Sequence, residues 1–181
     1  FKPSWTFKSG SVLPSASTGE LNLISNVFPA AAPQITELGA GSLLVWVHQN
    51  PILPVLQSTN ISWAYNSGGD NWTTPVAATD DTRAELYPVV ASTSSGRAVA
   101  AWVRIRDANF NTSIDSTSQL PLFYNRFDVV SSVFDSATRQ WSPVISITDD
   151  VAFDNALRVS SDNAGNLLLT WLSNAGGEFT S

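Results

Sequence analysis

The chain has 181 residues, enough for one domain with a substantial core. Hydrophobic residues make up 43% of it and charged residues only 13%, a composition that excludes an intrinsically disordered chain. The net charge of −6 argues against a nucleic-acid partner, and the absence of cysteine excludes disulfides and thiolate metal sites.

Residues 1–32 form the first segment. They contain Trp5 and several apolar residues between Leu21 and Phe28, but they lack the pattern that repeats through the rest of the chain. We expect them to supply one or two strands, which either complete a sheet within the chain or add to the edge of a neighbour.

Residues 33–87 form the first copy of a repeat. It begins at Pro33 and continues to an apolar strand around Trp46, then to a strand of alternating character from Ile61 to Tyr65. Turn-forming residues separate this strand from Trp72, and the copy ends near the acidic pair Asp80–Asp81.

Residues 88–156 form the second copy. Pro88, an apolar strand around Trp102, a strand from Val130 to Phe134, Trp141 and the acidic pair 149–150 follow in the same order. Trp102 and Trp141 are separated by 13 residues more than Trp46 and Trp72, so we place a loop insertion at about 104–125.

Residues 157–181 form a partial third copy, which runs from Leu157 to the strand around Trp171. No segment shows helical spacing, whereas short apolar runs bounded by glycine are typical of buried strands. We predict an all-β fold of antiparallel four-stranded blade-like repeats, either a partial β-propeller or an open β assembly. The predicted core tryptophans are Trp46, Trp102, Trp171, Trp72 and Trp141.

The strand ending in Trp46 and the later pattern from Tyr65 through Gly69 to Trp72 resemble the sialidase-type (BNR, or Asp-box) repeats of bacterial propellers. The resemblance covers residues 33–171 and implies a propeller fold. The Asp-box itself is not matched, because its Ser and Asp positions before Trp72 are Tyr65 and Ser67. A sialidase would also need three arginines, a Tyr nucleophile with a Glu partner and a nearby acid, and no such set can be assigned.

Two and a half blades do not close a ring. We therefore expect either a piece of a longer propeller or open sheet edges that pair with another chain.

The acidic pairs Asp80–Asp81 and Asp149–Asp150 recur at equivalent places, which favours hydrogen bonding to turn backbone over catalysis. Calcium binding is the alternative, with Asp154 and Asp162 as further ligands, but no cofactor or metal site is predicted. His48 is the sole histidine, and no nucleophile motif accompanies it.

Trp63 has no aromatic counterpart in the second copy, so it is a candidate for stacking on a sugar; ordinary packing is the alternative. Three N-x-Ser/Thr sequons, at Asn60, Asn71 and Asn111, are candidate glycosylation sites, although a chain rich in these residues also forms sequons by chance.

We therefore expect a non-catalytic extracellular or cell-surface module with a structural or adhesive role. It would bind a glycan or a protein, or copies of itself through open β edges, and would not insert into a membrane, because no apolar run reaches ~20 residues. One alternative is a fragment of a sialidase-like glycoside hydrolase, and another is a subunit of an extracellular filament.

Overall fold

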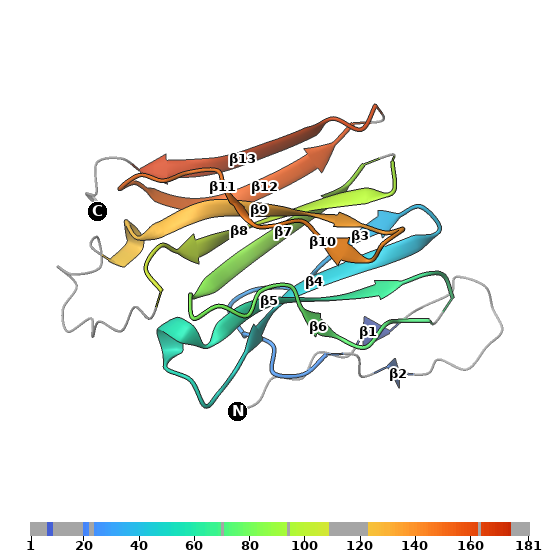
Figure 1. Cartoon of the computed structure of the whole chain (residues 1–181), viewed down its shortest axis with the longest axis horizontal. Helices are drawn as coiled ribbons and strands as arrows, with labels where there is room; N and C mark the ends of the chain where they lie inside the picture. The colour runs from blue at the N-terminus through green and yellow to red at the C-terminus, as the bar shows by residue number, and fades with distance from the viewer. Residues whose placement is uncertain are drawn as a thin grey trace.

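A computed structural model describes residues 7–8, 20–21, 24–69, 71–93, 95–108, 123–162 and 164–174. Within these ranges the chain forms antiparallel sheets that are stacked side by side without closing into a ring (Figure 1). A short 3₁₀-helix, η1 (Val55–Gln57), interrupts them, and the described residues include no helix that is long and apolar enough to cross a membrane.

The first sheet has the strand order β3-β4-β5-β6. Its strands are β3 (Gln34–Leu38), β4 (Gly41–Gln49), β5 (Thr59–Asn66) and β6 (Val76–Ala77). A tight turn joins β3 to β4, and Gly39 adopts there the left-handed φ of 67° that other residues disfavour.

The second sheet has the order β10-β9-β8-β7, with β11 also paired to β9. Its strands are β7 (Glu85–Ser92), β8 (Arg97–Ile105), β9 (Phe127–Asp135), β10 (Gln140–Trp141) and β11 (Ile145–Ser146). The connection from β8 to β9 contains the expected insertion, most of which (109–122) lies outside the described residues.

The third sheet contains β12 (Phe153–Ser161) and β13 (Leu167–Asn174), while β1 (Phe7–Lys8) and β2 (Glu20–Leu21) pair separately. The fold is thus all-β and antiparallel, with two blade-like sheets and two two-stranded sheets among the described residues, which fits a partial propeller. Strands β7 and β12 begin at Glu85 and Phe153, before Pro88 and Leu157. The first residues of these two strands therefore lie before the repeat boundaries predicted from the sequence.

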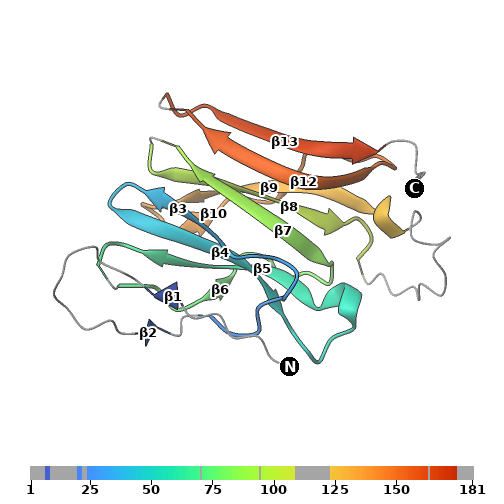
Figure 2. The same cartoon turned by 180° about the vertical axis from the view of Figure 1, so that it is seen from behind.

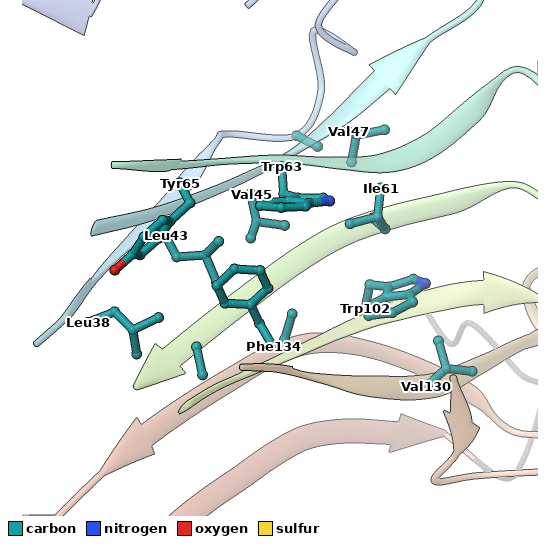
Figure 3. Close-up of a cluster of buried hydrophobic side chains, with 13 residues drawn as sticks. Leu38, Leu43, Val45, Val47, Ile61, Trp63, Tyr65, Trp102, Val130 and Phe134 are labelled. Carbon is teal, nitrogen blue, oxygen red and sulfur yellow. The ribbon is translucent and has the colours of Figure 1, made fainter. Parts of the chain in front are cut away.

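The core between the first two sheets is centred on Trp63 (Figure 3). Its ring centroid lies 4.9 Å from that of Phe134 and 6.4 Å from that of Trp141. Leu43 and Val45 of β4 complete this layer, and both are fully buried. The apolar faces of β4 and β5 thus meet β8 and β9 directly, which is how sheets of a propeller bury one another.

A second apolar layer joins the second and third sheets. Val103 and Val129 of the second sheet pack there with Leu157 of β12, and all three are buried. Leu169 and Trp171 of β13 are only half-buried against the same layer. The third sheet is therefore attached, but it is covered less completely than the other two.

A buried carboxylate also joins the first two sheets. Trp102 Nε1 donates to Glu85 Oε1 at 2.9 Å, and the Ile61 amide of β5 donates to Oε2 at 3.1 Å. The Thr79 hydroxyl also bonds to Oε2, and the Glu85 amide donates to Thr59 Oγ1 at 3.0 Å. We call these five residues the Glu85 cluster. It connects β7 and β8 to the first sheet through hydrogen bonds that water does not reach.

Burial raises the pKa of Glu85 from 4.5 to about 7, because the charged carboxylate is removed from water. The hydrogen bonds from Thr79, Trp102 and Ile61 act in the opposite direction, and the nearby charge of Asp81 adds to the rise. Desolvation outweighs the hydrogen bonds, so near neutral pH the cluster holds a mixture of protonated and ionised Glu85.

Replacing Trp102 with Ala should lower the free energy of unfolding by about 3–5 kcal/mol, because it creates a cavity in a fully buried layer and removes a hydrogen-bond donor from Glu85. Urea unfolding followed by circular dichroism measures this change. Val76→Ala, on the exposed strand β6, serves as the control and should change stability by less than about 0.5 kcal/mol. An unchanged midpoint for Trp102→Ala would contradict the assigned core.

The raised pKa of Glu85 predicts a specific pH dependence. Folded Glu85 holds its proton up to about pH 7 and unfolded Glu85 only to about 4.5, so its stabilising contribution is complete below 4.5 and is lost as pH rises through 7. Wild type should therefore lose up to about 3 kcal/mol relative to Glu85→Gln between pH 4.5 and 8. Unfolding curves of both proteins across this range measure the difference, and parallel pH profiles would rule the effect out.

Candidate functional site

The inner strands β3, β7 and β12 follow one another along one side of the stacked sheets (Figure 2). A cleft of about 930 Å³ lies along them and reaches the segment that follows the insertion. We call it the inner cleft. Hydrogen-bonding side chains in its lining include Gln34, Tyr87, Tyr124, Asn155 and Arg158.

Two equivalent bulges shape the inner cleft. The pairing of β7 with β8 shifts between Leu86 and Val89, and that of β12 with β13 shifts between Asn155 and Arg158. The first residue inside each shift, Tyr87 or Ala156, has a left-handed φ value, 55° and 53° respectively, and the two are 69 positions apart. A bulge redirects side chains, and Tyr87 remains 45% exposed on the lining of the cleft.

Aromatic rings line one end of the inner cleft. The Phe123 ring meets Phe127 edge-on with centroids 5.1 Å apart, and the Tyr124 ring lies 4.6 Å from that of Phe153. The Tyr124 contact holds the end of the insertion against the start of β12. The cleft thus combines a preformed aromatic wall with polar groups, a combination typical of sites for small polar ligands.

Asp154 on β12 is the counterpart of Glu85, 69 positions later, just as Trp171 is the counterpart of Trp102. Thr148 Oγ1 accepts from the Val129 amide at 2.9 Å, as Thr79 Oγ1 accepts from Ile61 in the Glu85 cluster. Yet Asp154 is only 1% exposed and neither of its carboxylate oxygens has a partner among the described residues. Its side chain is one methylene shorter than that of glutamate, so the second cluster is incomplete.

The acidic pairs lie in ion pairs and turns. Asp81 Oδ2 is 3.6 Å from Arg104 Nη1, and Asp149 Oδ1 is 3.4 Å from Arg106 Nε. Asp150 Oδ1 accepts from the backbone amide two residues later at 2.8 Å. The equivalent residues Asp81 and Asp150 thus both accept from a backbone amide two residues later, whereas the ion pairs involve different members of the two pairs.

The described part of the chain contains no group of three or more His, Asp or Glu side chains suited to holding a metal ion. Asp162 instead accepts hydrogen bonds from the backbone and the side-chain amide of Asn166 within one turn. The Nδ1 atom of His48 lies 3.3 Å from the carbonyl oxygen of Ser25, on the half-buried end of β4.

The tryptophans that the sequence singled out occupy different environments. Trp63 is only 8% exposed inside the core, so its ring is not available to stack on a sugar. Trp46 and Trp102 are fully buried, whereas the remaining three are half-buried: Trp72, Trp141 and Trp171.

Two sequon asparagines lie in described residues. Asn71 is exposed in the turn after β5, where a glycan has access. Asn60 is half-buried within β5 and its side-chain oxygen is shielded from solvent. Asn111 lies outside the described residues.

The arginines do not gather at the inner cleft. Of the seven, all in described residues, Arg158 lines the cleft. Arg97 pairs with Asp135 at 3.4 Å, and the guanidinium of Arg139 lies 5.8 Å from the centre of the Tyr65 ring. A three-arginine grip of the sialidase type is therefore not assembled by the described residues.

Sequence reasoning missed Glu85, Tyr87 and the role of Asp154. The sequence does contain a signal for Glu85 and Asp154, because the 69-residue repeat aligns these two acids with each other and Thr79 with Thr148. The repeat boundaries at Pro88 and Leu157 lie inside the two bulges, so Glu85 and Asp154 were assigned to the ends of the first two copies, away from the strands to which they belong.

Comparison with known proteins relates the chain to sialidases through its fold. No family model and no curated protein sequence matches it. A solved structure, Hadza microbial sialidase Hz136, superposes with a TM-score of 0.60 at 14% identity, over 79% of this chain and 32% of that one. Trypanosoma rangeli sialidase in complex with the inhibitor DANA gives 0.48 at 12% identity, over 99% and 35%. The chain spans about a third of the length of either protein. The superposition on Hadza microbial sialidase Hz136 shows a fold like part of a sialidase-type β-propeller.

Lengthening Asp154 should complete the second cluster. Asp154→Glu would bring the carboxylate within reach of Thr148 and Trp171, and each hydrogen bond gained contributes about 1 kcal/mol. Hydrogen exchange should show slower opening of β12 and β13 in this variant, with no change in Asp80→Glu, an exposed control for the same substitution. Faster opening in Asp154→Glu would mean that the site has no room for the added methylene.

Proposed function

We propose that the chain is a non-catalytic extracellular adhesive module that binds a glycan in the inner cleft. The observation that carries the proposal is the composition of the cleft, in which aromatic rings and hydrogen-bonding side chains share one preformed surface of three adjacent inner strands. Carbohydrates offer both C–H faces and hydroxyl groups, so they match such a lining.

Tyr87 is the expected centre of the site. Its ring is partly exposed, and its backbone is held in a conformation that a non-glycine residue seldom adopts. Strained backbone of this kind is frequent at binding sites, where the surrounding structure fixes one orientation of a side chain. Tyr87 would then supply a stacking surface, with Arg158 and Gln34 as hydrogen-bonding groups beside it.

The engagement of Glu85, Asp81 and Asp149 favours binding over catalysis, and Asp154, which lines the cleft without a hydrogen-bond partner, is only 1% exposed. Glu85 is held by Trp102, Ile61 and Thr79, so it is not free to assist a nucleophile. Asp81 and Asp149 are paired with arginines. The alternative, a part of a sialidase-like glycoside hydrolase, is favoured by the fold of Hadza microbial sialidase Hz136.

An extracellular location agrees with a composition rich in Ser, Thr and Asn and poor in Lys, and with the exposed sequon at Asn71. A glycan at Asn71 would lie in the turn after β5, away from the residues that line the inner cleft. Modification there would therefore leave ligand binding intact.

Titration calorimetry against a panel of soluble oligosaccharides tests the proposal. One glycan class should bind, and Tyr87→Ala should weaken that binding by about tenfold because an aromatic stacking contact contributes on the order of 1 kcal/mol. Ile145→Ala, on exposed strand β11 outside the cleft, is the matched control and should bind like wild type. Equal affinities for both variants would place the glycan elsewhere.

A fluorogenic sialoside assay tests the alternative that the chain is part of a sialidase-like glycoside hydrolase. The proposal expects no turnover above that of buffer, and turnover lost on Tyr87→Ala would establish the hydrolase instead. Absence of binding across the oligosaccharide panel, together with capture of a defined protein ligand by the same cleft, would replace the glycan with a protein.

A further inference from the structure

The Glu85 cluster adjoins the inner cleft along the first residues of β7. The carbonyl oxygen of Ala84 accepts from the Ile105 amide at 2.9 Å, and the Glu85 amide donates to a threonine hydroxyl of β5. Leu86 is the last residue that pairs with β8 before the bulge. Leu86 and Tyr87 both line the cleft. The side chain expected to contact the ligand, that of Tyr87, is therefore only two positions away from the buried carboxyl group.

Tyr87 needs the support of its neighbours because its backbone is strained. A φ of 55° is costly for a tyrosine, and such a conformation persists only where the surrounding structure enforces it. After Tyr87 the pairing resumes at Val89, and before it the strand is held by Leu86 and by the hydrogen bonds of Glu85. Release of Glu85 would therefore allow Tyr87 to return to an ordinary φ and to turn its ring out of the cleft.

The cluster accommodates a protonated Glu85 better than an ionised one. In the protonated form the hydroxyl at Oε2 can donate to Thr79 Oγ1, and Trp102 still donates to Oε1 at 2.9 Å. The Ile61 amide also has both acceptors within reach, Thr79 Oγ1 at 3.0 Å and Oε2 at 3.1 Å. In the ionised form a full negative charge is buried without a cation. Ionisation therefore favours a conformation in which water reaches Glu85.

No charged or titratable group pairs with Glu85 in the described part of the chain. The connection before β7 carries Asp80, Asp81 and Arg83. Asp81 adds to the rise in the pKa of Glu85. Its ion pairs, however, are with Arg83 at 3.9 Å and with Arg104 of β8 at 3.6 Å. The elements packed against β7 contribute the remaining groups, which are Glu37 on β3, His48 on β4, Tyr65 on β5, Arg97 on β8, and Asp154 and Arg158 on β12.

We propose that Glu85 is a positioning residue for the inner cleft, whose protonated form holds Tyr87 toward the ligand and whose ionised form opens the start of β7 and releases it. The opening is confined to this segment, because the bulge separates Glu85 and Leu86 from the rest of the strand. The closed conformation binds the proton more tightly than the open one, so acid favours the closed form. Ligand binding should therefore weaken as pH rises through about 7.

The effect on affinity rests on the proposed glycan site, whereas the release of Tyr87 does not. The apparent dissociation constant increases in inverse proportion to the population in which Tyr87 is held in place. For the oligosaccharide that calorimetry selects from the panel, this constant should rise at least about threefold between about pH 5.5 and 8.5. It should stay constant over the same range in Glu85→Gln.

The release of Tyr87 is measured in the free chain, with isotope labels at its three tyrosines and Tyr87→Phe to assign the signals. The one-bond coupling between Cα and Hα differs between left-handed and ordinary φ, so it reports on the backbone of Tyr87 directly. In wild type this coupling should change from its left-handed value at low pH toward the ordinary range at high pH. The coupling of Tyr65, which is buried in the core, should stay constant because the chain remains folded.

Three variants identify the responsible group. Glu85→Gln keeps a neutral side chain of the same length and should retain the left-handed coupling at Tyr87 at both pH values. His48→Gln is the matched control, because histidine is the side-chain type that ordinarily changes charge near neutral pH, and it should behave like wild type. Asp81→Asn removes a charge that raises the pKa of Glu85, so the midpoint of the change should move to lower pH.

A coupling at Tyr87 that stays constant in wild type would overturn the proposal, and so would an equal change in Glu85→Gln or a midpoint that Asp81→Asn leaves in place. An oligosaccharide that binds equally well at both pH values while the coupling changes would show that Tyr87 is released without affecting the site, which also overturns it. If the coupling changes as expected and no oligosaccharide binds at either pH, the positioning of Tyr87 by Glu85 is supported and the proposed glycan function is wrong.

Discussion

The packing of the first two sheets against each other depends on Glu85, a carboxyl group that is removed from contact with water. Glu85 is fully buried, and its hydrogen bonds come from both sheets, through Ile61 and Thr79 on one side and Trp102 on the other. A buried carboxyl group is costly unless donors surround it, so the donors of the two sheets favour the relative position in which they all meet Glu85. The apolar layers contribute most of the stability of this packing, while the Glu85 cluster determines how the two sheets are aligned.

The same constraint explains why the inner cleft lies where it does. Glu85 and Asp154 stand at the starts of β7 and β12, and a bulge follows each of them within three residues. Anchoring at the start of the strand and a shift of register shortly after turn Tyr87 toward the cleft. The candidate site thus depends on how Glu85 holds the start of β7, whereas Asp154 makes no equivalent hydrogen bond in β12.

Much of this architecture could be predicted from the sequence, because the apolar strands around Trp46 and Trp102 are local patterns with a constant relation to the rest of each copy. The location of Trp63 could not, since burial between two sheets depends on Phe134, more than 70 residues away. Left-handed backbone at Tyr87 was equally hidden, because neither tyrosine nor alanine is a residue that marks a turn. Local chemistry specified the strands, and distant packing specified the site.

The missing methylene at Asp154 has a consequence for the order in which the molecule assembles. Hairpins such as β3-β4 and β12-β13 join strands that are adjacent in sequence through short loops, so they form quickly, whereas residues 106–126 separate β8 from β9. Docking between sheets comes later, and the first pair gains the Glu85 cluster while the third sheet docks through apolar contacts and an unsatisfied acid. Unfolding should therefore begin at β12 and β13. This end of the molecule is consequently where strands would exchange most readily.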